Sequence, residues 1–116
     1  PQLTRMFAYR ISDGKLVVLN KFKEALFSAA KADASFITED EETSGVLNVT
    51  SYFKKNAKDK NSYYVFVAQV HATGDALLKA RPDITDAAAK AELAKAIEAG
   101  QIYLMTISNW DAIYGG

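Results

Sequence analysis

The chain has 116 residues, 49% of them hydrophobic and 24% charged, and its 14 basic side chains are balanced by 14 acidic ones. This composition excludes a disordered chain, and a net charge of zero excludes a protein whose whole surface attracts polyanions. The lack of cysteine excludes disulfides, thiol nucleophiles and thiolate metal sites. No run is apolar enough to span a membrane and the start lacks a signal-peptide segment, so we expect a cytoplasmic or otherwise intracellular protein.

The first part of the chain predicts a hairpin followed by a helix. Residues 3–11 and 15–19 alternate apolar and polar or are β-branched, and Asp13-Gly14 between them is typical of a type I′ turn. Asn20 is then a suitable cap for a helix over residues 21–32, where apolar residues recur at helical spacing.

The middle of the chain predicts a second pair of strands. An acidic stretch, 38–44, is expected to be a solvated loop, and residues 46–53 are expected to form a strand. A polar turn at 54–61 leads into the strongest strand signal, residues 62–73, whose even positions are all apolar. We therefore predict that 62–73 is the central strand, with one face fully covered and the other only half apolar.

The last third predicts helix and then strand. Asp75 is expected to begin a short helix that ends before Pro82, and Asp83 or Thr85 to cap an alanine-rich helix as far as Gly100. Residues 102–108 predict a closing strand, and residues 109–116 a tail.

Together these elements predict a single α+β domain, residues 1–116, with a largely antiparallel sheet and two main helices on one face. The order is ββαββαβ, or the ferredoxin-like βαββαβ if the first hairpin is instead a strand entering a helix. The expected core comprises Phe7, Phe22, Leu26, Leu47, Val49, Phe66, Val70, Leu93 and either Leu104 or Ile107.

The half-apolar sheet face is the first candidate site. We expect it to carry Val46, Tyr52, Tyr63, Val65 and Val67. No third long helix is predicted to cover it, and exposed apolar faces of this kind mark interfaces. The function expected from this face is a non-catalytic interaction module that self-associates or binds a protein partner. The C-terminal tail, with Trp110 and Tyr114, is the competing cover for this face.

The 52–64 hairpin is the second candidate site. Its members are Lys54, Lys55, Lys58, Lys60, Tyr52 and Tyr63. Lysines contact phosphates and aromatic rings stack on bases, so this set suggests a platform for single-stranded nucleic acid. The alternative is a solvated turn whose lysines discourage aggregation at the sheet edge.

No motif indicates a cofactor, a metal site or a catalytic constellation. The acidic run at 39–42 lacks the spacing of an EF-hand, and His71 is the one histidine, with no nucleophile placed beside it. We therefore expect that the protein is not an enzyme.

Pro1 gives the alternative enzyme hypothesis. In this first residue and in its coarse layout, the chain resembles the tautomerase superfamily, whose enzymes use a terminal proline amine as catalytic base. The resemblance implies that Pro1 would be that base. No motif assigns substrate-binding residues, although Arg5, Arg10 and Lys31 are basic residues in the first half.

Overall fold

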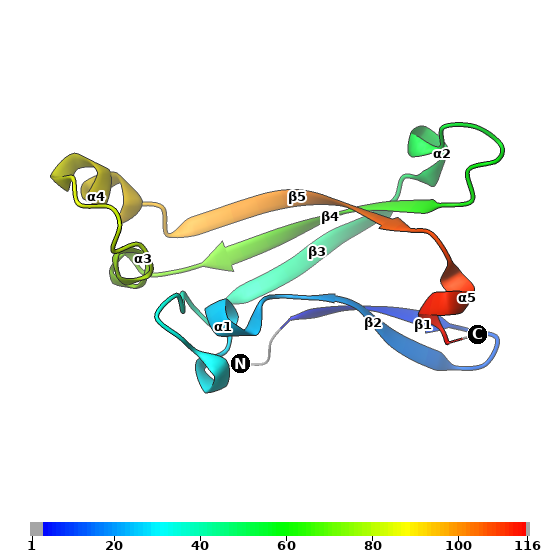
Figure 1. Cartoon of the computed structure of the whole chain (residues 1–116), viewed down its shortest axis with the longest axis horizontal. Helices are drawn as coiled ribbons and strands as arrows, with labels where there is room; N and C mark the ends of the chain where they lie inside the picture. Colours follow the sequence, from blue (N-terminus) through cyan, green and yellow to red (C-terminus); the bar gives the residue numbers. More distant parts are fainter. Residues whose placement is uncertain (1–3, 116) are drawn as a thin grey trace. The chain divides into compact units, whose positions relative to one another are not determined.

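The computed structural model describes residues 4–115 and is an α+β protein with one two-stranded and one three-stranded antiparallel sheet. The strands are β1 Arg5–Arg10, β2 Lys15–Lys21, β3 Glu41–Asn48, β4 Ser62–His71 and β5 Glu98–Ile107. The helical segments are α1 Glu24–Phe27, the 3-10 turn η1 Ala29–Lys31, α2 Thr50–Phe53, α3 Gly74–Ala80, α4 Ala87–Leu93 and α5 Trp110–Ile113. The strands follow the predicted ββαββαβ order, but short helical segments replace the two main helices (Figure 1).

The chain groups into two compact units. Of the described residues, the helical unit combines Thr4, Lys21–Glu42 and Gln69–Gly100, and the strand unit combines Arg5–Asn20, Thr43–Ala68 and residues 101–115. The single domain expected from the length of the chain stays a prediction.

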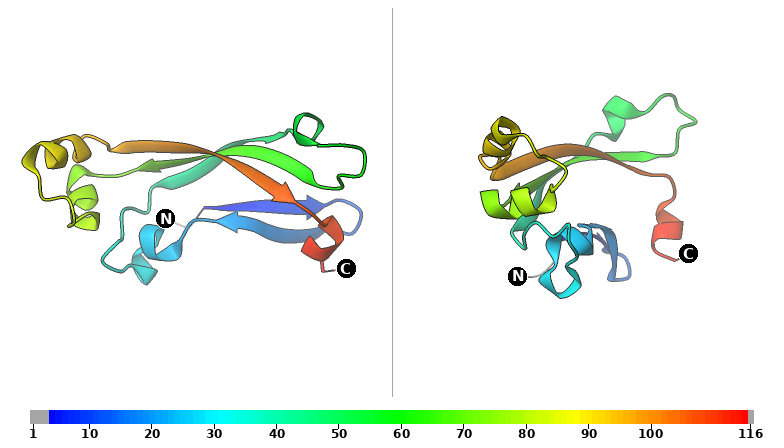
Figure 2. Two further views of the ribbon diagram at one scale, coloured as in Figure 1. Left: turned by 45° about the horizontal axis from the view of Figure 1, so that its top comes forward. Right: turned by 60° about the vertical axis from the view of Figure 1, so that its left-hand side comes forward.

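The strand unit has two layers. The β1–β2 hairpin runs alongside the three-stranded sheet, whose order β3-β4-β5 confirms the prediction that β4 is the central strand (Figures 1 and 2). The buried side chains of this unit are Met6, Tyr63, Phe66, Ala68, Ile107 and Tyr114. Phe66 is only 2% exposed and stacks on Tyr103 of β5, with ring centroids 5.3 Å apart.

The hairpin forms as predicted, but its turn is longer than the expected type I′ turn. The Gly14 N–H donates to the Arg10 carbonyl at 2.9 Å and closes a loop over residues 11–14. Gly14 alone in this loop has positive φ, at 72°, whereas a type I′ turn needs two such residues. Asp13 holds the turn instead, because its carboxylate accepts two hydrogen bonds from the Arg10 guanidinium at 2.9 and 2.5 Å.

The helix predicted over residues 21–32 is wrong. One turn forms at α1, after which Ser28 is extended and the chain continues into η1. The Ala29 N–H, which would extend the helix, donates instead to the Glu39 carboxylate at 2.8 Å. Phe27, expected near the edge of the helix stripe, is buried and meets Phe22 edge-on.

The third strand lies earlier than predicted. β3 starts at Glu41, inside the expected acidic loop, and ends at Asn48. The Asn48 side chain then accepts a hydrogen bond from the Thr50 N–H at 3.0 Å, and the chain turns into α2. Because asparagine offers the backbone this local partner, the expected strand over 46–53 gives way to a turn and a helix.

In the helical unit, α3 packs against α4. Thr73 and Asp86 cap the two helices, in place of the expected Asp75 and Asp83 or Thr85. Gly74 makes the close approach possible, because a Cβ there would lie 2.6 Å from the Ala94 carbonyl oxygen. α4 stops well before Gly100, since the Ile97 carbonyl accepts from the Ala72 N–H at 2.8 Å, just before β5 begins.

The predicted core is correct for Phe66 and for Ile107, one of the two alternatives given for β5, and wrong for two other residues. Phe7 and Leu47 are 50% and 62% exposed. Each lies on a strand that is apolar on both faces, so alternation alone could not select the buried face. The remaining members are half-buried: Phe22, Leu26, Val49, Val70 and Leu93.

Candidate interaction surfaces

The three-stranded sheet has an inner face, which carries the buried Phe66, and an outer face on the opposite side. The pairing of the strands determines which side chains share the outer face. The Val49 N–H donates to the Tyr63 carbonyl at 2.9 Å, which places these two residues opposite each other. Because the strands are antiparallel, moving two residues along each of them places Leu47 opposite Val65. The stack of Phe66 on Tyr103 pairs these two residues on the inner face. Their neighbours along each strand therefore point to the outer face.

The outer face is an apolar surface, which we call the sheet patch. Its members are Leu47, Val65, Val67, Ile102 and Leu104. Ile102 is 71% exposed and Leu47 62%, while the central Val65 and Val67 are half-buried. Three of the five residues predicted for this face lie on it, namely Tyr63, Val65 and Val67, although Tyr63 is buried. Val46 alternates with Leu47 along β3 and so points to the inner face, on a strand at the edge of the sheet, and it is 51% exposed.

Tyr63 closes one end of the sheet patch and is not itself exposed. Its hydroxyl donates to the Asp59 carboxylate at 2.9 Å, and its ring stacks on Phe53 with centroids 6.0 Å apart. Only 7% of Tyr63 is exposed. The loop that follows α2 therefore covers a residue that the sequence placed on the open face.

The C-terminal segment packs on the inner side of the sheet. The Trp110 indole N–H donates to the Ser62 hydroxyl at 3.1 Å, and its ring meets Tyr64 edge-on at 6.0 Å. Tyr114 stacks on Trp110 and lies beneath the Arg10 guanidinium, 4.6 Å from its ring centroid. Ser62 and Tyr64 share the face of Phe66, so α5 does not cover Val65 and Val67.

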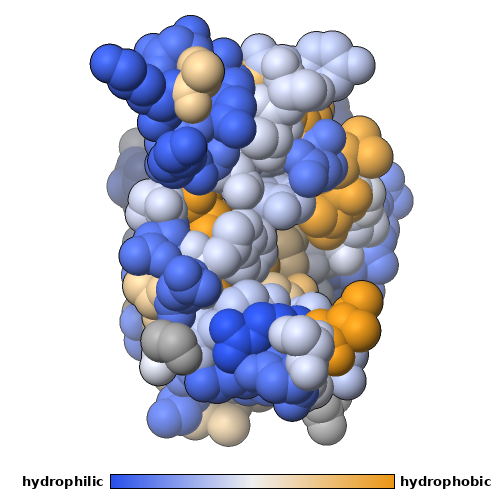
Figure 3. All heavy atoms as spheres, turned by 90° about the vertical axis from the view of Figure 1, so that its right-hand side faces the viewer, coloured by the Kyte–Doolittle hydropathy of each residue, from blue (hydrophilic) through white to orange (hydrophobic). Residues whose placement is uncertain are grey.

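The lysine loop, residues 54–61, is ordered by Asp59. Its carboxylate accepts from the N–H groups of Asn61 and Lys55 and from the Tyr63 hydroxyl, and the Asn61 and Tyr63 hydrogen bonds lower the pKa of Asp59. All four predicted lysines of the loop are exposed. Tyr52 is 86% exposed, but it lies on α2 rather than on a strand beside Tyr63. Figure 3 shows a mainly hydrophilic surface at the end of the strand unit that carries this loop.

A second apolar surface, which the sequence analysis did not identify, lies on the outer face of the hairpin. We call it the hairpin patch: Phe7, Tyr9, Ile11, Leu16 and Val18, exposed by 50%, 61%, 88%, 59% and 51%. Met6, Ala8, Val17 and Leu19 alternate with them and are buried or half-buried. The sequence did contain a signal for this patch, because both faces of the hairpin are apolar. A single layer packed on one face cannot bury the other face.

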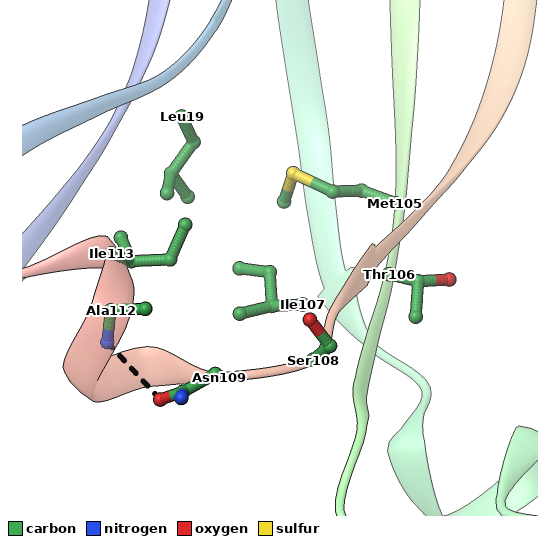
Figure 4. Close-up of a pocket in the computed structure, with 8 residues that line it drawn as sticks. All are labelled: Leu19, Met105, Thr106, Ile107, Ser108, Asn109, Ala112 and Ile113. Carbon is green, nitrogen blue, oxygen red and sulfur yellow. Dashed lines mark hydrogen bonds between the residues drawn. The ribbon is translucent and has the colours of Figure 1, made fainter.

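An open hollow of about 310 Å³ lies where α5 meets the hairpin and β5. Leu19, Met105, Ile107 and Ile113 point toward one another around it (Figure 4). The Asn109 side chain at its rim is engaged as the cap of α5, accepting from the Ala112 N–H at 3.1 Å. Among the residues that the structure describes, the lining carries no titratable side chain.

The predicted acidic loop is structured. Glu39 accepts from the Ala29 N–H, and Glu41 accepts from the Thr4 N–H at 2.8 Å. Glu41 is 7% exposed, and its backbone carbonyl also accepts from the Thr4 hydroxyl. These carboxylates hold the backbone of the helical unit rather than forming a solvated cluster.

Within residues 4–115 no group of three or more His, Cys, Asp or Glu side chains is placed to hold a metal ion. His71 lies 4.0 Å from Glu98 and no closer to any carboxylate in this part of the chain. Arg10, a basic residue of the tautomerase hypothesis, is engaged by Asp13 and Tyr114. Pro1 lies outside the described residues.

No helix in the described part of the chain is long and apolar enough to cross a membrane. Comparisons with protein-family models, with curated proteins and with solved structures find no match.

Proposed function

We propose that the protein is a non-catalytic interaction module that self-associates or binds a protein partner through the sheet patch. The observation that carries this proposal is a row of apolar side chains across all three strands that neither α5 nor the lysine loop covers. The patch leaves on the order of 400 Å² of apolar surface in contact with water, within the range of functional patches on monomers.

Burial of this surface would be favourable. At about 25 cal/mol per Å², removing 400 Å² of apolar surface from water contributes on the order of 10 kcal/mol before the costs of association. β-Branched and leucine side chains on a pleated face also have restricted rotamers, so little side-chain entropy is lost when they pack.

The test compares two lysine substitutions at adjacent positions of β5. Ile102→Lys places a charge in the sheet patch, whereas Gln101→Lys places the same charge on the neighbouring exposed residue, which points to the other face. Both sites are exposed, so the stability of the monomer should change by no more than about 0.5 kcal/mol. Light scattering on a size-exclusion column should give a mass above 12.7 kDa for the parent and for Gln101→Lys, and the monomer mass for Ile102→Lys. Equal masses for the two variants would refute self-association through the sheet patch.

A second candidate function, binding of single-stranded nucleic acid, is favoured by the exposure of Tyr52 beside four exposed lysines. Replacing the four lysines with glutamine should flatten the salt dependence of binding, by roughly 0.7 in the log-log slope for each phosphate that is no longer neutralised. Tyr52→Ala should cost about 1–3 kcal/mol at every salt concentration. Fluorescence anisotropy with a labelled oligonucleotide at low salt is the assay. A flat titration at tens of micromolar protein would exclude this function.

A further inference from the structure

The strand unit exposes an apolar surface on both of its layers. The hairpin patch belongs to the two-stranded layer and the sheet patch to the three-stranded layer, and each points away from the buried residues between the layers. A foreign partner bound to one patch would leave the other in water. If the hairpin patch of one copy bound the sheet patch of another copy, a single kind of interface would cover both patches.

We infer that the occupant of the sheet patch is the hairpin patch of a second copy of this chain, in a head-to-tail contact. This inference rests on the proposed function, and it identifies the partner of the sheet patch as a second copy of the chain.

The packing chemistry of this contact is already present inside the strand unit. There Leu19 of the hairpin lines the same hollow as Met105 and Ile107 of β5, and Met6, Phe66 and Ile107 are buried. The outer faces are built from the same kinds of side chain on the same two layers. Twisted sheets stack face to face at about 10 Å, so the outer faces of two copies can pack as two layers of sheet.

The areas agree with a stable contact. The hairpin patch leaves on the order of 500 Å² of apolar surface exposed, so that with the sheet patch a contact would bury roughly 900 Å² of apolar area. Since roughly 57% of an ordinary interface is apolar, the whole contact would bury about 1,600 Å². This is the standard size of a specific protein–protein interface.

Charge does not oppose the contact. The 14 basic and 14 acidic side chains cancel, so two copies approach without net repulsion. A head-to-tail contact is heterologous, and it therefore produces a ring where the rotation closes and a chain of copies where it does not.

The experiment uses two variants that each disable one patch. Leu16→Lys charges the hairpin patch and Ile102→Lys charges the sheet patch, while Ser12→Lys in the turn and Gln101→Lys in β5 are the matched controls. Each patch variant should be monomeric, because a lysine buried within an apolar contact weakens association by roughly 30-fold or more. The controls should assemble like the parent.

Mixing the two patch variants is the decisive step. Each retains one intact patch, so an equimolar mixture should form a 1:1 dimer that goes no further, with the mass measured by sedimentation. Formation of this dimer also shows that both variants are folded.

Other results overturn the inference. If Leu16→Lys assembles like the parent while Ile102→Lys does not, the sheet patch pairs with itself, and the proposed function stands without the head-to-tail contact. If both variants are monomeric and mixing forms no dimer, the two patches do not bind each other. If the parent is monomeric at about 100 µM, the sheet patch serves a different protein and not a second copy.

Discussion

The strongest test of the fold is a comparison of two phenylalanines that differ in burial but share a chemical setting. Phe66 is 2% exposed and stacks on Tyr103, and Phe53 is 45% exposed and stacks on Tyr63. Replacing either by alanine removes the same atoms and one aromatic stack, worth about 0.5–1.5 kcal/mol. The difference between the two substitutions therefore measures the burial of Phe66 in the inner layer.

Phe66→Ala should cost about 3–5 kcal/mol of unfolding free energy, because an almost completely buried ring is removed and a cavity remains. Phe53→Ala should cost about 1–2 kcal/mol, since about half of its surface is already in contact with water. Urea unfolding followed by circular dichroism, at a low protein concentration, measures both values. A loss below about 1 kcal/mol for Phe66→Ala, or equal losses for the two variants, would show that the inner and outer faces of β4 are exchanged.

Three further predictions concern single residues. The Arg10 hydrogen bonds lower the pKa of Asp13 from 3.8 to about 2. This pair therefore stabilises the fold above about pH 4, and its contribution disappears as the pH falls toward 2. Asp13→Asn should be less stable than the parent at neutral pH, and the unfolding free energies of the two proteins should converge near pH 2. Gly74→Ala should destabilise by about 1–3 kcal/mol in urea unfolding, because its Cβ would collide with the Ala94 carbonyl, and a neutral effect would contradict the close approach of α3 and α4. Tyr52→Ala should leave the free energy of unfolding within about 0.5 kcal/mol of the parent, and a larger loss would mean that its ring is packed.

The sequence was sufficient to predict the centre of the sheet. Residues 62–71 combine β-branched and aromatic residues with an unbroken apolar row, and this double signal correctly predicted a central strand with Phe66 on its buried face. The half-apolar character of the opposite face likewise predicted that Val65 and Val67 would lie away from the fully covered side.

The parts that could not be predicted depend on contacts between residues distant in the sequence. The helical periodicity of 21–32 was real, but Glu39 takes the Ala29 N–H and ends the helix. Tyr63 lies on the outer face as predicted, yet it is buried because Asp59 and the loop fold over it. A periodic pattern reports which side chains share a face, and it does not report which distant carboxylate or loop will reach that face.

The hairpin illustrates a second limit. Phe7 and Tyr9 alternate with Met6 and Ala8, so both faces of β1 are apolar and the sequence offered no reason to choose between them. The structure buries the smaller pair and exposes the aromatic pair. That choice creates the hairpin patch, and for this reason the second interaction surface was not found from the sequence.

The most direct measurement of the central claim, that the sheet patch is an interface, is thiol labelling of an introduced cysteine. The chain has no cysteine of its own, so the introduced one is the single reactive thiol. A single cysteine at Ile102→Cys reports on the patch, and one at Gln101→Cys reports on the neighbouring exposed position of the same strand. The rate of thiol labelling is measured for each variant from about 1 µM to about 100 µM protein. Labelling of the Ile102→Cys variant should slow as the concentration rises, because association covers the patch, while labelling of the Gln101→Cys variant should stay constant. Rates that are independent of concentration for both variants would contradict self-association through this face.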